Sequence, residues 1–194
     1  MRRSVSLKPG ARPEARRLLN LSAWMYGGMV TVSLVWGFAR DLTPSWWRLE
    51  TPNEVALALG LGAAVGLAGI GVSRLLERTV EAVRNLGARF GHILRHAGPK
   101  EAILLAVFSS VGEEMLFRGC LQEELGLWPA TIAFALVHVG PDRTYLWWTA
   151  SALVFGLGLG ILYDAQGGLL APITMHFVIN AVNITILARR ARAL

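Results

Sequence analysis

The stretch that decides the fold is "AILLAVFSSVGEEMLFRGCLQ", residues 102–122. It begins as an apolar run of the kind that crosses a membrane, yet near its middle it carries Glu113, Glu114 and Arg118. On insertion scales, one charge at the centre of a membrane helix costs roughly 2.5–3.5 kcal/mol. Three such residues persist there only when they pair, face a wet cavity or take part in chemistry.

The composition of the whole chain predicts a membrane protein. Of its 194 residues 54% are hydrophobic and 16% are charged, against about 25% charged in ordinary soluble domains. The net charge of +6 does not indicate nucleic-acid binding, because the basic residues gather at the ends of apolar runs and form no stripe with aromatic residues. The single cysteine, Cys120, excludes an intrachain disulfide.

Apolar runs of about 20 residues are long enough to cross the hydrocarbon core. Six runs qualify fully or nearly, at 19–39, 54–73, 101–122, 128–140, 145–163 and 167–188. The first is longer than a signal-peptide core and lacks a convincing cleavage site, so we expect it to be retained. The fold class predicted is therefore all-α, a polytopic membrane helix bundle with about six transmembrane helices.

Charge divides the chain into segments. Residues 1–18 form a basic tail, 19–73 two transmembrane helices, 74–100 an amphipathic basic interfacial helix, 101–188 a largely apolar core that carries the polar residues discussed below, and 189–194 a second basic tail. With six spans these basic segments fall on one side, so both termini are expected in the cytoplasm. The Ala-, Gly-, Leu- and Arg-rich composition favours a bacterial cytoplasmic (inner) membrane.

Two minor patterns have structural interpretations. His92 and His96 lie one turn apart in the amphipathic segment, without a nearby carboxylate or cysteine to complete a metal site, and are read as interfacial residues. The small-residue pairs, Gly62 with Gly66 and Gly156 with Gly160, predict close approach of membrane helices.

The polar residues of three apolar runs form a candidate site. Glu114 and Arg118 are four residues apart and can pair on one helix face, which leaves Glu113 about 100° round the helix. His138 lies in "FALVH", and His176 begins "HFVIN", which ends at Asn180.

These residue types indicate hydrolysis. A carboxylate and an imidazole can together hold and deprotonate a water molecule, and an amide with a second imidazole can stabilise an oxyanion. Two histidines and a glutamate can instead bind zinc with an open fourth position. The HExxH pattern is absent, so no metal site is firmly predicted; Glu113, His138 and His176 would be the ligands if zinc is used.

The motifs "EEMLFR", "FALVH" and "HFVIN" match EExxxR, FxxxH and HxxxN in order, each in an apolar run. In these motifs the chain resembles the CPBP family of intramembrane proteases, which includes the type II CAAX prenyl endopeptidases and bacterial Abi proteins. The resemblance covers roughly residues 100–188. It implies that Glu113 and His138 activate water, that His176 and Asn180 form the oxyanion site, and that Glu114 and Arg118 support the first helix.

The resemblance also implies an activity. It predicts an intramembrane endopeptidase that cuts membrane-anchored proteins near a C-terminal transmembrane or lipidated segment, in maturation or, as in the myxosortases, in removal of a sorting signal. The family has been described both as metalloproteases and as metal-independent glutamate proteases, so we expect no required cofactor and keep zinc as the alternative. The lipid bilayer is an expected partner and nucleic acid is not; the oligomeric state is not indicated.

Three other readings stay open. A non-proteolytic Abi-type immunity or scaffold protein would have no need of all six polar residues. A proton-coupled transporter is less favoured because no internal repeat is present. Cys120 lies two turns after Glu113 and could pair with His138 as a nucleophile, but a cysteine in an apolar helix is more often an inert packing residue.

Overall fold

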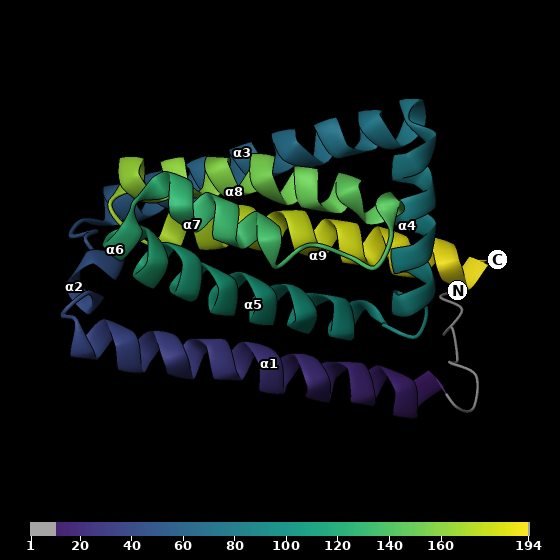
Figure 1. The fold of residues 1–194 in the computed structure, drawn as a ribbon, viewed down its shortest axis with the longest axis horizontal. Coiled ribbons are helices and arrows are strands. Elements are labelled where there is room, and N and C mark those ends of the chain that lie inside the picture. Colours follow the sequence, from purple (N-terminus) through teal and green to yellow (C-terminus); the bar gives the residue numbers. More distant parts are fainter. Residues whose placement is uncertain (1–10, 194) are drawn as a thin grey trace.

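The structure is a computed structural model that describes residues 11–193. It is a bundle of helices that lie roughly side by side, with one helix crossing its end (Figure 1). Within the described residues the β-type pairing is a single isolated bridge between Trp47 and Gly168. The predicted all-α fold is confirmed.

The first two long helices are α1 (Ala11–Ala39) and α3 (Pro52–Thr79), joined through the short helix α2 (Thr43–Trp46). The start of α3 is set by local sequence. The Thr51 hydroxyl accepts a hydrogen bond from the Glu54 backbone N–H at 3.3 Å, and the Glu54 carboxylate accepts one from the Thr51 N–H at 3.0 Å. This reciprocal cap, with Pro52 in the first turn, satisfies N–H groups that the helix leaves unpaired.

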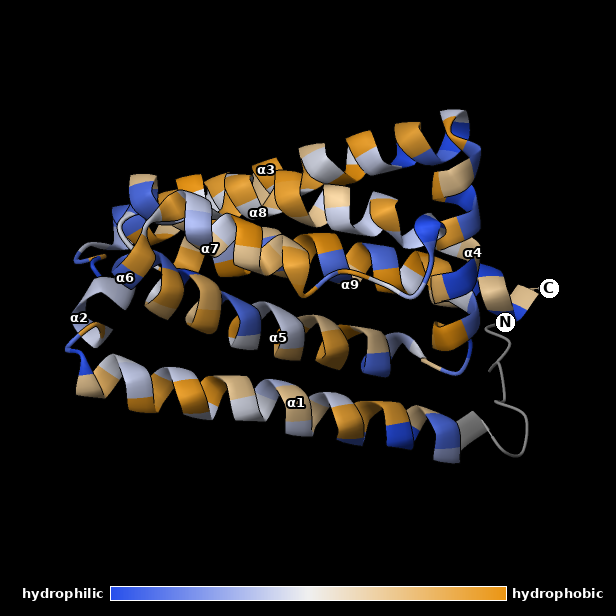
Figure 2. Ribbon diagram, viewed as in Figure 1, coloured by the Kyte–Doolittle hydropathy of each residue, from blue (hydrophilic) through white to orange (hydrophobic). Residues whose placement is uncertain are grey.

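Helix α4 (Glu81–Leu94) crosses the end of the bundle, where α1 begins and α9 (Leu170–Ala193) ends (Figure 1). It is separated from α3 by Val80, whose backbone is extended. Leu86 and Gly91 face the bundle and are buried. The other faces of α4 are largely hydrophilic (Figure 2). The amphipathic helix predicted for 74–100 therefore exists, but residues 74–79 continue α3.

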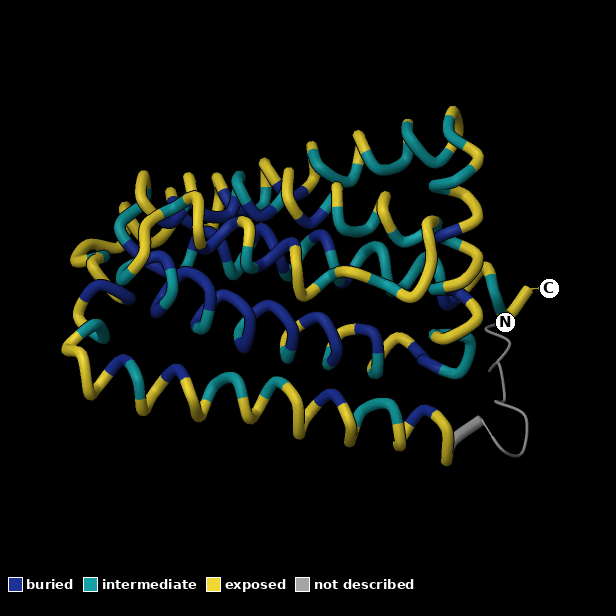
Figure 3. Tube along the Cα trace, viewed as in Figure 1, coloured by how far each residue is buried: buried dark blue, intermediate teal, exposed yellow. Residues whose placement is uncertain are grey.

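Helix α5 (Pro99–Leu116) is the central element and packs against α1 and α9. Much of it is buried, in contrast to the outer side of α1 (Figure 3). It continues into a π-helical turn, η1 (Phe117–Gln122), then α6 (Glu123–Leu125) and α7 (Leu127–Leu136). Wider π turns inside α-helices are frequent at functional sites, and this one includes Arg118.

The last two long helices are α8 (Leu146–Gln166), preceded by the 3-10 turn η2 (Arg143–Tyr145), and α9. Glycines let α3 approach α9 closely. A Cβ atom at Gly66 would come within 3.0 Å of the Met175 carbonyl oxygen, and one at Gly62 within 2.9 Å of the Thr174 Cβ. The predicted small-residue contact of Gly62 and Gly66 is confirmed.

The predicted number of membrane spans is wrong. Within the described residues four helices, not six, are long and apolar enough to cross a membrane: Pro13–Ala39, Pro52–Thr79, Arg143–Gln166 and Leu170–Ala193. The run at 128–140 fails because α7 has 10 residues, about 15 Å of helix. The run at 101–122 fails because its α-helix carries three carboxylates and gives way to η1. Several long apolar helices still make this an integral, multi-pass membrane protein.

The basic tails predicted at the two ends lie partly outside the described residues. Residues 1–10 and 194 are not described. Residues 11–18, assigned to the N-terminal tail, instead form the first turns of α1, and residues 189–193, assigned to the C-terminal tail, are the last turns of α9.

Candidate active site

Helix α5 directs its two adjacent glutamates to different sets of neighbours, which share His176. The Glu114 side chain is completely buried and Glu113 is nearly so. The Glu114 carboxylate lies 3.3 Å from the Arg118 Nε atom and 2.7 Å from the His176 Nδ1 atom. The pairing of Glu114 with Arg118 is therefore confirmed, and the structure adds that Glu114 also holds His176 of α9.

The buried Arg118 side chain has three kinds of partner. Besides Glu114, one of its terminal nitrogens donates a hydrogen bond to the Gly156 carbonyl of α8 at 2.8 Å. Its guanidinium carbon also lies 4.5 Å from the centroid of the Phe134 ring, within the range of a cation–π contact. Arg118 thus contacts α7 and α8 as well as Glu114 of α5.

Glu113 faces both histidines. Its Oε2 atom is 3.7 Å from the His138 Nε2 atom and 3.9 Å from the His176 Nε2 atom, and this oxygen is buried without a hydrogen-bond partner. His138 follows the end of α7 and reaches back to the Phe134 carbonyl with Nδ1 at 2.6 Å. Side chains from three separate segments therefore meet at one point.

The protonation of the two rings follows from their other contacts. The Phe134 carbonyl and the Glu114 carboxylate can only accept, so the Nδ1 atoms of His138 and His176 carry the protons in these bonds. In the neutral rings both Nε2 atoms are then acceptors, and they face a third acceptor on Glu113. Two imidazole acceptors at 3.7 and 3.9 Å from a carboxylate oxygen suit a proton donor between them, such as a water molecule, or a cation.

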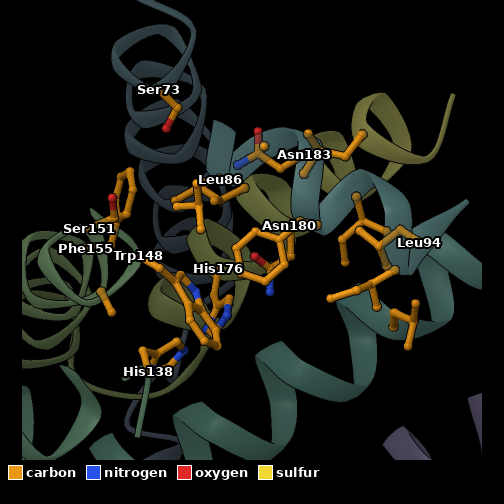
Figure 4. A pocket seen from close by; sticks show the side chains of 18 of the residues that line it. Ser73, Leu86, Leu94, His138, Trp148, Ser151, Phe155, His176, Asn180 and Asn183 are labelled. Atoms are coloured by element: carbon orange, nitrogen blue, oxygen red, sulfur yellow. The ribbon is translucent and has the colours of Figure 1, made fainter. Parts of the chain in front are cut away.

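Asn180 lies one turn after His176 on α9. Its side-chain nitrogen donates a hydrogen bond to the Ser109 hydroxyl of α5 at 2.9 Å. An amide nitrogen carries two N–H groups, so a second remains for another acceptor. Glu113, His138, His176 and Asn180 all line a cavity of about 460 Å³ between the helices, and Figure 4 shows the last three on its wall. Glu114 and Arg118 are not among the lining residues.

Several contributors were not predicted. Ser109 precedes Glu113 by one turn, and Phe134 precedes His138 by one turn, so helical spacing could have indicated both. Tyr26 of α1 and Trp148 of α8 also line the cavity. No spacing in the sequence relates these two residues to the motifs, because they enter from helices that are distant along the chain.

Cys120 does not belong to the site. It is buried, and its thiol contacts the Ser33 carbonyl of α1 at 3.5 Å. The thiol is not among the groups that line the cavity of Glu113 and His138. In a regular α-helix, Cys120 would lie two turns from Glu113 on nearly the same face. The π-helical turn η1 instead directs Cys120 toward α1.

The types of donor atom in this site suit zinc, but the atoms lie farther apart than the ligands of a zinc ion do. Each imidazole has its Nδ1–H anchored and its Nε2 directed inward, as in many metal sites. Zinc ligands at about 2.0–2.2 Å in tetrahedral geometry lie roughly 3.4 Å from one another, and the separations here are 3.7 and 3.9 Å. Among residues 11–193 no group of three His, Cys, Asp or Glu side chains has metal-holding geometry.

Comparison with known proteins finds a family similarity in the segment that carries this site. Residues 99–182 match the sequence model of the type II CAAX prenyl endopeptidases described as Rce1-like. Residues 99–182 are thus similar to the Rce1-like type II CAAX prenyl endopeptidases. The match includes the six polar residues of the three motifs, whereas α1, α3 and α4 lie outside it.

One curated relative and the solved structures add context to the Rce1-like match. An uncharacterized protein, YpbD of Bacillus subtilis (strain 168), is 40% identical over 82 residues, which are 41% of this chain and 42% of that protein. The match thus spans less than half the length of this relative. No solved structure matches the chain.

Proposed function

We propose that the protein is an intramembrane endopeptidase that hydrolyses a peptide bond in membrane-anchored proteins, with water activated by Glu113 and His138. The observation that carries the proposal is the convergence of Glu113 Oε2 with the Nε2 atoms of His138 and His176 at 3.7 and 3.9 Å on the wall of a cavity between the helices. The Rce1-like match supports a protease. The name of the matched family says nothing of protein sorting, so the proposal leaves that role aside.

The acceptor geometry supports a water-activation step. A water molecule between Glu113 and His138 would pass one proton to this pair as its oxygen attacks the carbonyl carbon of the scissile bond. The electrons of the carbonyl double bond then move to its oxygen and form the oxyanion. Collapse of this intermediate breaks the C–N bond, and the proton held by the pair passes to the leaving nitrogen.

We assign oxyanion stabilisation to His176 and Asn180. The free N–H of Asn180 can donate directly. His176 can donate from Nε2 only as an imidazolium, and the Glu114 carboxylate 2.7 Å from its Nδ1 would stabilise that charge. In this scheme Glu114 acts through His176 and Arg118, and it does not touch the substrate.

The proposal requires no metal. Zinc, if bound, would be held by Glu113, His138 and His176 and would act as a Lewis acid. Elemental analysis of purified, active protein before and after chelation decides between the metal-free and the zinc-dependent mechanism. Full activity with no bound metal is expected. One zinc per chain, with activity lost on its removal and restored on its return, would reverse this part of the proposal.

We also propose the orientation and the substrate class. Both ends of the described chain and α4 share one end of the bundle (Figure 1), and basic residues concentrate there, which favours that end in the cytoplasm. A bacterial cytoplasmic membrane is the proposed location, and the substrates are membrane proteins with a C-terminal transmembrane or lipidated segment. The cavity is lined by residues of α1, α3, α8 and α9, the four helices that are long and apolar enough to cross a membrane, which supports a substrate held at membrane depth.

Substrate trapping tests the activity. A tagged Glu113→Gln chain, expressed in a host that lacks the wild-type gene, should co-purify with uncut membrane proteins. Mass spectrometry should show these proteins shortened at their C-terminal side only when the wild-type chain is restored. Glu81→Gln, at an exposed carboxylate of α4, is the matched control and should behave as wild type. Identical membrane-protein termini with and without the wild-type chain would instead favour a scaffold or immunity protein.

A further inference from the structure

Residues 43–48, which we call the strap, consist of α2 and the two residues after it. They lie at the same end of the bundle as α6 (Figure 1). The Leu169 N–H donates a hydrogen bond to the Trp46 carbonyl at 3.0 Å, and the Arg48 N–H donates one to the Gly167 carbonyl at 3.2 Å. The strap is therefore bound to the turn that connects α8 to α9.

The side chain of Trp46 fills a slot between α1 and the π-helical turn η1. It is 3% exposed, and its indole Nε1–H donates a hydrogen bond to the Gly119 carbonyl at 2.7 Å. A Cβ atom at Gly119 would come within 2.7 Å of this nitrogen, and one at Gly37 of α1 within 2.5 Å of the indole Cζ2 atom. Both distances are too short for a side chain in a close-packed interior, so the indole fits only because both positions are glycine.

The turn η1 also extends two donors onto α8. Arg118 donates to the Gly156 carbonyl at 2.8 Å, and the Gln122 Nε2 atom donates to the Gly160 carbonyl at 3.0 Å. Donors and acceptors are each four residues apart, so η1 and α8 are in register over successive turns. A π turn departs from the regular hydrogen-bond pattern of the α-helix, and the bond from Trp46 to Gly119 stabilises it between these two donors.

The direction of η1 matters for the site because of Arg118. This arginine compensates the buried charge of Glu114, and Glu114 in turn binds the Nδ1 atom of His176 at 2.7 Å. A change in η1 would therefore pass through Arg118 and Glu114 to the imidazole. Trp46 itself is not among the residues that line the cavity, so it influences the site only through these contacts.

We propose that Trp46 is a positioning residue of the candidate active site: through Gly119 it fixes the π turn that directs Arg118 to Glu114, and so it sets the orientation of His176. The inference rests on the proposed function for its effect on cleavage. It gives the strap, which lies outside the Rce1-like match over residues 99–182, a role in the geometry of the matched segment.

The hydrogen bond between His176 and Glu114 can be measured without cleavage. In the full chain, purified in detergent with isotope-labelled histidine, the Nδ1–H of His176 should give a downfield proton signal, which His176→Gln assigns. Trp46→Phe keeps an aromatic ring and removes the indole N–H, so we expect this signal to move upfield or broaden. Trp47→Phe, at the exposed neighbour in the strap, is the matched control and should leave it unchanged. An unchanged His176 signal in folded Trp46→Phe would overturn the proposal.

Kinetics separate positioning from a general loss of stability. Small misplacements at a reacting centre are costly in rate, so Trp46→Phe should lower kcat about 10-fold or more. Because Trp46 does not line the cavity, KM should change by less than about 2-fold. Trp47→Phe should keep both values. A wild-type kcat for Trp46→Phe, with only a lower unfolding temperature, would show that Trp46 supports the fold and does not position the site.

A second variant moves the indole without removing its N–H. A Cβ atom at Gly37 would clash with the Trp46 ring, whereas one at Gly28 of the same helix meets open space. Gly37→Ala should therefore shift the His176 signal, and Gly28→Ala should not. If neither Trp46→Phe nor Gly37→Ala folds, Trp46 supports the whole fold and its assignment to the site is wrong. A shifted signal without shortened proteins in the trapping experiment would keep the positioning role and contradict the protease, so the two failures are distinguishable.

Discussion

At the residue scale, the adjacent carboxylates have separate tasks because a helix turns about 100° per residue. Glu114 is enclosed by Arg118 and His176, so its charge is compensated. Glu113 faces two imidazole nitrogens and has a buried oxygen without a hydrogen bond. In the proposed mechanism the first arrangement supports the fold, and the second leaves an unsatisfied acceptor for the activated water.

The glutamate and thiol mechanisms predict opposite mutational results. Glu113→Ala, His138→Ala and His176→Ala should each abolish processing, because each removes one of the three converging groups. Cys120→Ala should keep most of the activity, because that thiol contacts Ser33 and not the cavity. Processing is followed by the mobility shift of a trapped substrate, with the membrane level of each variant measured alongside. An inactive Cys120→Ala together with an active Glu113→Ala would exclude the glutamate mechanism.

Substitutions of Glu113 and of Glu114 should change the stability of the protein differently. Glu114→Gln leaves the buried Arg118 guanidinium without its carboxylate, and removing one partner of a buried ion pair costs about 3–5 kcal/mol. Glu113→Gln gives the two histidine acceptors an N–H donor, so it should keep or raise the unfolding temperature while activity is lost. Thermal unfolding in detergent measures both. A larger loss of stability for Glu113→Gln than for Glu114→Gln would contradict these assignments.

Substitution of Asn180 should lower kcat more than substitution of its hydrogen-bond partner Ser109. Asn180→Ala removes a proposed oxyanion donor, and such losses lower kcat by about 10²-fold or more. Ser109→Ala keeps the amide and removes only its hydrogen-bond partner, so the fall in kcat should be smaller. Cleavage rates of a trapped substrate at saturating concentration give both values. Near wild-type kcat for Asn180→Ala would remove this residue from the oxyanion site.

At the scale of the elements, close helix contacts position the site. Gly62 and Gly66 bring α3 against α9, which carries His176 and Asn180. The π-helical turn lets Arg118 reach Gly156 of α8. The site is therefore held by the close approach of α3 to α9 and by the Arg118 contact with α8, as well as by its own polar contacts.

Two glycines of α3 test this dependence. A Cβ atom at Gly62 would clash with the Ala171 carbonyl and Thr174, whereas one at Gly60 meets open space. Gly62→Ala should destabilise the protein by roughly 1–3 kcal/mol, as overpacking does. Gly60→Ala, its matched control, should be neutral or slightly stabilising because alanine favours the helix. Unfolding temperatures in detergent compare them, and equal effects at the two positions would argue against the α3–α9 contact.

At the scale of the whole molecule, charge separates the two ends of the bundle. Arg40 and Arg48 lie at the end near α2. The opposite end carries most of the basic residues that the structure describes: Arg16, Arg17, Arg78, Arg84, Arg89, Arg95, Lys100, Arg143, Arg189, Arg190 and Arg192. This asymmetry is the basis of the proposed orientation.

Labelling of single cysteines in a Cys120→Ala background tests that orientation. Cysteines at Asp41 and Ala165, which are exposed near the α2 end, should react with a membrane-impermeant maleimide in intact cells. A cysteine at Ala88, exposed on α4, should react only after the cells are lysed. Labelling of Ala88→Cys in intact cells, with Asp41→Cys protected, would invert the orientation.

The sequence by itself determined the features that depend on local spacing. Helices follow from runs of apolar residues, and the Glu114–Arg118 pair follows from a separation of four residues on one helix. Predictions from the same helical spacing were wrong where the regular α-helix ends. Helix α7 ends at Leu136, and η1 changes the direction of Cys120. Two of the six predicted spans failed in these regions.

Only the tertiary structure decided which distant residues meet. That His176 binds Glu114 and faces Glu113, and that Arg74 shares their cavity, depends on how α3, α5 and α9 pack. Arg74 looked like the first basic residue of an interfacial segment, because its spacing in the sequence carries no information about α9. Contacts between helices are set by side-chain packing and close backbone approach, whose partners lie far apart in the chain.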